Sequence, residues 1–306
     1  MNKFIKSHFI FLLTGVMVLG FFIPAPFQFI GKYVVFILAA IMVTSFLSID
    51  LAKMFKKLAK PKDMITVFAI VKILIPAGLY FALRPFDPMI ALAVLLLSAA
   101  PAAATSPTFT KICKGDAEFT TMILVVTAVL SPVTLPLTIN LLAGTNISID
   151  IFGMVKTLVQ LVVIPLAISV LLKKFCREAV KKYEPAFGSI ALILLSILLL
   201  GVVAQGAKDI RDHFELFSKY LTVSCIFGVF LALAGWFFFF FYNREKRIGL
   251  ALSTSYVNIG MIIVLASRYF PVEVVIFALI FEIPANILPG IIKKIVLKKS
   301  AYSEIS

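Results

Sequence analysis

Long apolar stretches alternate with short polar or charged segments along the whole sequence. A helix that spans a bilayer needs about 20 mostly apolar residues, and ten stretches approach or exceed this length. The connections between them are short and leave no room for a separate soluble domain. The pattern predicts an all-α polytopic membrane protein, one transmembrane unit over residues 1–306, with helices near 7–24, 33–51, 64–83, 89–113, 117–142, 151–172, 186–204, 219–242, 248–267 and 273–296.

The first apolar stretch has a second interpretation. Lys3 and Lys6 precede it and it ends near Pro24, so it also resembles a signal peptide, for which Ala25 offers a weak cleavage site. We favour an uncleaved transmembrane helix, because the membrane topology described below balances only if this helix is kept.

Basic residues are unevenly distributed over the connections. If the N-terminus is cytoplasmic, the segments on the cytoplasmic side hold 21 of the 29 Lys and Arg residues, and those on the opposite side hold 6. Lys72 and Lys156 lie within helices. Because cytoplasmic loops are enriched in Lys and Arg, we expect a multi-pass protein of the cell membrane, such as a bacterial inner membrane, with both termini in the cytoplasm.

The composition agrees with this class and excludes others. Hydrophobic residues make up 61% of the chain, charged residues 14%, and the mean hydropathy is +1.08, whereas soluble domains are about 45–50% apolar and about 25% charged. The net charge of +14 comes from short clusters and not from one basic face, so we expect no nucleic-acid partner. Three scattered cysteines and two isolated histidines indicate no disulfide framework, metal centre or catalytic centre, so we expect no enzyme and no cofactor other than an ion.

The ten predicted helices divide into two sets of five, over 1–142 and 151–299. Five is odd, so consecutive copies of such a unit insert with opposite orientation. The fourth helix is interrupted at Pro101–Pro107, and the ninth by a polar stretch at 253–258 followed by Gly260. Interrupted helices at equivalent positions of two inverted halves indicate the binding site of a transporter. A sensor or structural membrane protein would need no such pair.

The first interruption frees backbone groups. Pro107 lacks an N–H and disfavours helical geometry at Ser106, so carbonyls near Ala103 lose partners, which in hydrocarbon costs several kcal/mol each. Such groups are tolerated where they line a wet cavity and bind something. In the alternative, the prolines only kink the helix and the hydroxyls bond back to their own helix. The candidate binding residues are Thr105, Ser106, Pro107 and Thr108 in the first half and Ser253, Thr254, Ser255 and Asn258 in the second.

Charged residues also lie inside predicted helices. Lys72 is nine residues into the third helix, and Glu282 lies deep in the tenth. An isolated charge near the bilayer centre costs at least about 2.5–3.5 kcal/mol, so we expect both to reach the interrupted helices and to pair there or titrate during transport. In the alternative, Lys72 extends to the cytoplasmic interface and Glu282 is a protonated structural carboxyl. Lys156 and Gln160, one turn apart on the sixth helix, either meet a substrate carboxylate or mark the outer interface.

The two interruptions carry a resemblance to a known family. The segment APAAATSPTFTKICKGDAEFTTMILVVTAVLSPVTLPL resembles the fourth and fifth helices of the bile acid:sodium symporter family, and YVNIGMIIVLA and LIFEIPANILPGII resemble its later helices. The resemblance implies two broken helices that cross near the membrane midplane in a core domain of helices 3, 4, 5, 8, 9 and 10. It also implies a panel domain of helices 1, 2, 6 and 7, and elevator-like alternating access for organic anions.

Departures from the family pattern leave the coupling ion open. Ala102, Ala103 and Pro107 stand where the family has glycines and an Asn, and Val257 stands where it has a Gln. Lys72 lies within one residue of a cation ligand of sodium-coupled relatives, so a fixed ammonium could stand in for a sodium ion. The remaining candidate sodium ligands implied by the resemblance are Ser106, Thr120, Ser253 (which replaces an acidic residue) and Asn258.

Two functions follow from these observations. The first is a secondary active transporter in the lipid bilayer that carries a small organic anion, with sodium as the candidate coupling ion. The alternative is a sodium-independent carrier, proton-coupled or facilitative, that uses Lys72 and Glu282. The oligomeric state stays open between a monomer and a homodimer.

Overall fold

A computed structural model describes residues 2–49, 61–144 and 150–303, and the regular elements in these ranges are all helices. This confirms the predicted all-α class. The basic residues counted at 53–60 and the last residues of the helix predicted at 33–51 lie outside the described ranges. The helices are α1 (Asn2–Phe22), η1 (Gln28–Tyr33), α2 (Val34–Leu47), α4 (Pro61–Ala69), η2 (Ile70–Leu74), α5 (Ile75–Leu83), α6 (Pro88–Ala99), α7 (Ser106–Ile112), α8 (Ala117–Ala143), α9 (Ile151–Leu158), η3 (Val159–Val163), α10 (Ile164–Phe175), α11 (Arg177–Asp212), α12 (Phe214–Phe237), α13 (Arg244–Ser255), α14 (Ile259–Tyr269) and α15 (Val272–Ser303).

Seven helical segments of the described chain are long and apolar enough to cross a membrane. They coincide with seven of the spans predicted from the sequence. Three shorter apolar helices, Leu12–Phe22, Pro88–Ala99 and Ile259–Tyr269, overlap the other three predicted spans. The long segments are Gln28–Leu47, Met64–Leu83, Ala117–Ala143, Ile151–Phe175, Arg177–Asp212, Phe214–Phe237 and Val272–Val296.

Several helix boundaries differ from the prediction, and two of these differences have a clear physical reason. α11 begins at Arg177 instead of near 186, because its first turns are rich in Arg, Glu, Ala and Lys, which favour helix although they are too polar for a membrane core. α12 ends at Phe237 instead of near 242, although the chain stays apolar. The chain turns there because Asn243 caps α13, accepting a hydrogen bond from the Lys246 N–H at 3.1 Å.

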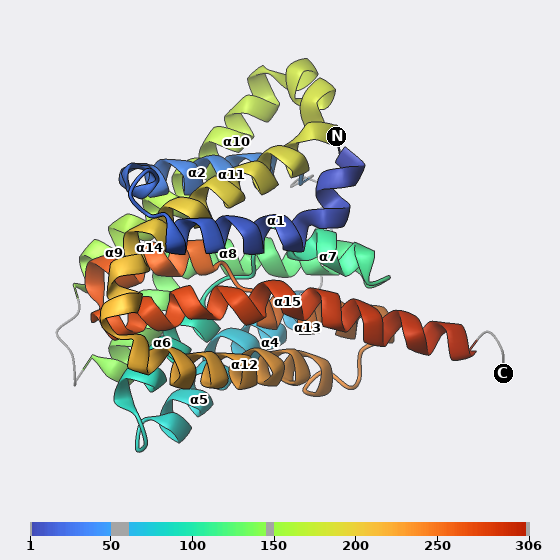
Figure 1. Ribbon diagram of the computed structural model, residues 1–306. Helices are drawn as coiled ribbons and strands as arrows, with labels where there is room; N and C mark the ends of the chain where they lie inside the picture. The colour runs from blue at the N-terminus through green and yellow to red at the C-terminus, as the bar shows by residue number, and fades with distance from the viewer. Residues whose placement is uncertain (1, 50–60, 145–149, 304–306) are drawn as a thin grey trace.

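The helices form two groups that lie against each other (Figure 1). α1, α2, α10 and α11 lie together in the upper part of the view, and α11 packs along both α1 and α2. α5, α6, α12 and α15 lie in the lower part, with α5 against α6 and α12 against α15. α7, α8 and α14 lie between the two groups. The boundary between the groups is where the candidate site lies.

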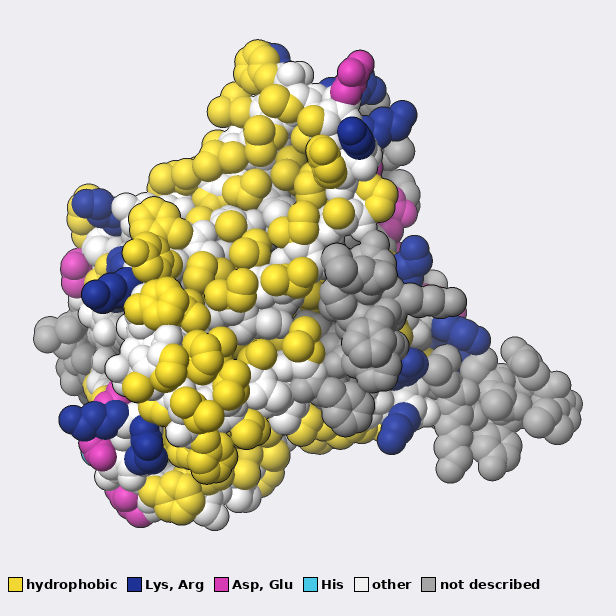
Figure 2. Space-filling model, turned by 45° about the horizontal axis from the view of Figure 1, so that its top comes forward, with side chains coloured by type: hydrophobic (Ala, Val, Ile, Leu, Met, Phe, Trp, Pro, Cys, Tyr) yellow, Lys and Arg dark blue, Asp and Glu magenta, His cyan; other side chains and the backbone are white. Residues whose placement is uncertain are grey.

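The surface of the molecule suits a lipid environment. Figure 2 shows a broad face covered by hydrophobic side chains, with Lys and Arg gathered near its two edges. Among the exposed apolar side chains are Phe36, Val133, Leu141, Phe152 and Ile226, which come from four different helices. Exposed apolar patches of this extent mark contact with a membrane or a partner. The arrangement supports the multi-pass membrane protein that the sequence predicts.

Two helices contain a π-helical turn, at Ile70–Leu74 and at Val159–Val163. Each turn is followed closely by a proline, Pro76 in one helix and Pro165 in the other. A proline ring clashes with the carbonyl four residues earlier and offers it no N–H, and an inserted π turn relieves this conflict. In the first case the carbonyl concerned is that of Lys72, so Pro76 explains why the helix is deformed at this lysine.

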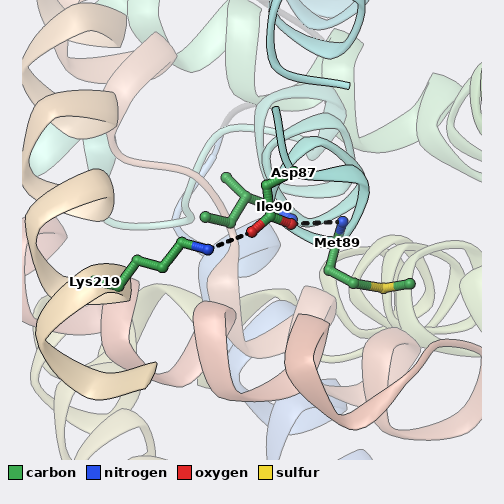
Figure 3. A network of polar contacts seen from close by, with 4 residues as sticks. All are labelled: Asp87, Met89, Ile90 and Lys219. Atoms are coloured by element: carbon green, nitrogen blue, oxygen red, sulfur yellow. Dashed lines mark hydrogen bonds and ion pairs between the residues drawn. The ribbon is translucent and has the colours of Figure 1, made fainter. Parts of the chain in front are cut away.

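An ion pair holds α6 to α12 at one end of the bundle (Figure 3). Asp87 caps α6, because its Oδ1 accepts hydrogen bonds from the N–H groups of Met89 and Ile90, both at 2.9 Å. Its Oδ2 lies 2.6 Å from the Lys219 Nζ of α12. Partial burial alone would raise the pKa of the Asp87 carboxyl, but the bonds with Lys219 and the two N–H groups lower this pKa below its usual value.

Candidate functional site

The two helix interruptions meet in space. The chain is not helical between α6 and α7 or between α13 and α14, and Ala102 and Val257 form an antiparallel bridge between these segments. The Ala103 N–H donates to the Tyr256 carbonyl and the Asn258 N–H donates to the Pro101 carbonyl, each at 2.9 Å. Backbone groups that the interruptions release therefore satisfy one another across the contact.

Proline and asparagine explain where the four helices end and begin. Ala100, which precedes Pro101, is extended, with a ψ of 148°, as expected for a residue before proline. Pro107 lies in the first turn of α7, where a missing N–H costs little. Asn258 caps α14, since its Oδ1 accepts from the Met261 N–H at 3.2 Å. Asn258, the position that matches the family, thus has a structural role.

Lys72 and Glu282 are both buried beside the interruptions but bond to different partners. The Lys72 Nζ donates to the Ser98 carbonyl at 3.2 Å and to the Ala100 carbonyl. A Glu282 carboxylate oxygen accepts from the Asn286 Nδ2 at 2.8 Å. Among the described residues no ion pair joins Lys72 to Glu282. Their side chains are 3% and 5% exposed, so in this structure neither extends to an aqueous interface.

Most of the predicted hydroxyl ligands are buried near the interruptions. Ser106, Thr120, Ser253, Thr254 and Ser255 are all at most 1% exposed. Three of them bond back to their own helices, as the alternative interpretation holds: Thr120 to Asp116 at 3.0 Å, Ser253 to Leu250 at 3.3 Å and Ser255 to Ala251 at 2.7 Å.

The other two hydroxyls, Ser106 Oγ and Thr254 Oγ1, are buried and have no hydrogen-bond partner in the part of the chain that the structure describes. A buried unsatisfied hydroxyl is costly, and oxygen donors suit a hard cation such as sodium. α13 approaches α8 closely at this point. A Cβ added to Gly249 of α13 would lie only 2.4 Å from the Thr120 Oγ1 of α8. The oxygen atoms at this point fit a sodium ion in part. Two hydroxyl oxygens are free to bind it, but none of the predicted sodium ligands is a carboxylate, and the Asn258 Oδ1 already caps α14.

A cavity of about 410 Å³ lies between α2, α7, α8 and α11. Its apolar lining includes Phe109, Phe187 and Leu192. Lys111 is the one charged side chain among the described lining residues. The hydroxyl-bearing residues that line the cavity are Thr44, Ser45, Ser48, Thr105, Thr108 and Thr121.

A smaller cavity of about 40 Å³ adjoins the larger one at the crossing itself. It is lined by Tyr256, Asn258 and Glu282, and it shares Ala104 and Thr105 with the larger cavity. The two cavities therefore lie next to each other, and the smaller one lies where the interruptions meet.

The structure separates one predicted pair from this site. Lys156 and Gln160 are exposed on α9 and η3, and neither lines a described cavity. The sequence did not identify Lys111 or the hydroxyl-bearing residues of α2 as lining residues of the cavity. Lys111 was used there only to assign the membrane topology. The sequence TSFLS at 44–48 carried a signal, since polar residues one turn apart at the end of an apolar helix share one face.

Comparison with known proteins identifies the family. The profile of the Sodium Bile acid symporter family matches residues 35–213, which run from α2 to the end of α11 and include the first interruption. The chain belongs to this family. Members of the sodium bile acid symporter family are membrane transporters, which confirms the resemblance noted in the sequence.

Three relatives show how far the similarity extends. The Bacillus subtilis (strain 168) protein YbaS is 29% identical over 83% of this chain and 87% of its own length. The uncharacterized sodium-dependent transporter YocS of the same organism is 26% identical over 98% and 97%. A probable sodium/metabolite cotransporter of Arabidopsis thaliana chloroplasts, BASS1, is 24% identical over 70% of this chain and 53% of its own length. Similarity to YocS thus spans nearly the whole chain.

Proposed function

We propose that this protein is a secondary transporter that carries a small organic anion across a membrane by alternating access. The observation that carries the proposal is the hydrogen-bonded crossing of the two helix interruptions beside a polar cavity of about 410 Å³. Non-helical backbone at membrane depth is tolerated where it is enclosed by protein and lines a cavity. Paired interruptions of this kind are typical of the binding sites of transporters.

The membrane topology in this proposal has ten spans. α6 with α7, and α13 with α14, each count as one interrupted span, and α1 is a further span. Two inverted five-helix halves, residues 1–142 and 151–299, then place the interruptions at equivalent positions, with both termini in the cytoplasm. α1, α2, α11 and the span made of α9, η3 and α10 form the panel, and the helices of spans 3, 4, 5, 8, 9 and 10 form the core. The grouping in Figure 1 supports this division.

The cavity lining supports a substrate with one negative charge and an apolar body. Lys111 offers a single cation, and neither Asp nor Glu is among the described residues that line the large cavity. Hydroxyls of Thr105 and Thr108 offer hydrogen bonds to a carboxylate or similar group, while Phe109 and Phe187 offer apolar contact. Ligand pockets of about 300–1,000 Å³ take small molecules in this way.

Sodium is the candidate co-substrate. The unpartnered hydroxyls of Ser106 and Thr254 support a cation between α7 and α13, with Thr120 and Ser253 as further candidate ligands. The name of YocS, a sodium-dependent transporter, agrees with this. A second candidate, a sodium-independent carrier, is favoured by Lys72, which already supplies a positive charge at the first interruption.

Uptake into proteoliposomes tests the proposal. We expect saturable uptake of at least one small carboxylate from a panel of radiolabelled monoanions, measured with an inward gradient of sodium, of protons, or of neither. Acceleration by the sodium gradient supports symport, and equal rates in all three conditions support facilitated transport. Absence of uptake and of ligand-dependent thermal stabilisation for every anion of the panel would contradict the proposed function.

A further inference from the structure

The carbonyls at the end of α6 have lost their helical donors. In an unbroken helix the Ala102 N–H would bond to the Ser98 carbonyl, but here it donates to the Thr127 Oγ1 of α8 at 3.2 Å. The Ala100 carbonyl lies beyond the last residue of α6. Lys72 takes the place of the missing donors, because its Nζ bonds to both carbonyls.

Neighbouring carbonyls at the crossing are satisfied by backbone N–H groups. The Pro101 carbonyl accepts from Asn258, and the Ala103 carbonyl accepts from Ser106, each at 2.9 Å. The two carbonyls at the end of α6 are therefore distinguished by having a side-chain cation as their partner. They also lie at the negative end of the α6 dipole, where a cation is stabilised.

The position of Lys72 is fixed by the fold. Lys72 lies within the π turn before Pro76, and the residue is 3% exposed, so water does not replace its contacts. A charged side chain at this depth persists only with partners of opposite polarity. Carbonyl oxygens are also the ligands that a hard metal cation uses.

We propose that the Lys72 ammonium is a built-in cation that occupies the end of α6 in place of a bound metal ion. It binds the Ser98 and Ala100 carbonyls permanently, so neither folding nor transport requires sodium at this position. The inference rests on the proposed function only for its consequence in transport; its test needs no substrate. The sodium site proposed at the hydroxyls of Ser106 and Thr254 is a different site, and a sodium ion bound there would be present in addition to the Lys72 ammonium.

The test replaces Lys72 by glutamine and measures thermal unfolding of the purified protein. Lys72→Gln removes the charge and supplies an amide oxygen beside the two carbonyls, which together offer oxygen ligands to sodium. We expect it to melt below the wild type in N-methylglucamine chloride and to gain on the order of 3 °C more than the wild type does when sodium replaces N-methylglucamine at equal ionic strength. Lys72→Met offers no ligand and should stay destabilised in both buffers.

Lys173 provides the matched control. Its Nζ donates to the Phe46 carbonyl at 2.8 Å and to the Ile49 carbonyl at the end of α2, but it is partly exposed, so water can take its place. Lys173→Gln should show the same sodium response as the wild type.

Two results would overturn the inference. In one, Lys72→Gln melts like the wild type without sodium, so the ammonium is not needed. In the other, Lys72→Gln is destabilised or fails to accumulate and sodium does not improve it beyond the wild-type response, so no cation site has been uncovered. Failure of the proposed function appears separately, as absence of transport by the wild type.

Discussion

Lys111 and Lys114 are neighbours on the same short segment, but only Lys111 lines the large cavity. We expect Lys111→Gln to raise the KM for a monoanionic substrate about tenfold, because a charge-assisted hydrogen bond is worth roughly 1.5–3 kcal/mol and part of it is screened at an exposed site. Initial rates of uptake at varied substrate concentration measure this. Lys114→Gln removes the same charge from the same region and should leave KM unchanged; equal effects of the two variants would assign Lys111 to the general surface potential.

The hydroxyls of Ser106 and Thr254 are buried and have no hydrogen-bond partner among the described residues, so we expect them to contribute nothing to the stability of the fold. We expect Ser106→Ala and Thr254→Val to unfold at the wild-type temperature or above it, because each removes an unsatisfied polar group that costs about 1–3 kcal/mol. Sodium activation of transport should fall in both. Ser196→Ala is the control, since the Ser196 hydroxyl donates to Leu192 at 2.9 Å in α11. If Ser106→Ala or Thr254→Val melts more than a few degrees below the wild type in sodium-free buffer, the removed hydroxyl does stabilise the fold and the prediction is wrong.

At the scale of helices, Asp87 combines a helix cap with an ion pair (Figure 3). Asp87→Ala should lower the free energy of unfolding by about 1 kcal/mol, the usual value of an N-cap. Asp87→Asn keeps a side-chain oxygen that can cap α6, so it should lower the free energy of unfolding by less than Asp87→Ala does.

The lowered pKa of Asp87 also predicts a pH dependence. Since the folded-state pKa is below the unfolded one, the carboxylate stabilises the fold above its ordinary pKa, and this contribution is lost as pH falls through the lower folded-state value. Melting temperatures of wild type and Asp87→Asn should therefore converge below about pH 4. Parallel curves down to pH 3 would mean that the Lys219 pair contributes nothing.

The sequence was a good guide to element type and a poor guide to contacts. Its long apolar stretches predicted the all-helical membrane class, and prolines at 101 and 107 marked a segment that the structure places against 256–258. It predicted that Lys72 would reach the interrupted helices, but not that its Nζ would bond to the carbonyls at the end of α6, because this depends on a π turn and on how two helices pack. The boundaries of α11 and α12 were missed because helix formation there follows propensity and capping, not hydrophobicity.

At the scale of the whole molecule, cavities lie at both ends of the boundary between the two helix groups. The large cavity contacts the C-terminal end of α2 and the N-terminal part of α11. A cavity of about 260 Å³ contacts the opposite ends of the same helices, at Val34, Gln205 and Asp209, together with Ser267 of α14. The crossing of the interruptions lies between them. The proposed alternating access predicts that these two cavities open in turn, as the groups move relative to each other.

The most direct measurement is the accessibility of two engineered thiols in a background without the native cysteines. Thr121→Cys places a thiol in the large cavity, and Ser267→Cys places one in the cavity at the opposite end. Labelling by a membrane-impermeant maleimide, from either side of oriented vesicles, should reach Cys at 121 only from the cytoplasmic side and Cys at 267 only from the other. Ions or anions that drive transport should change the two rates in opposite directions. Rates that are unaffected, or that rise and fall together, would contradict transport by alternating access at the crossing.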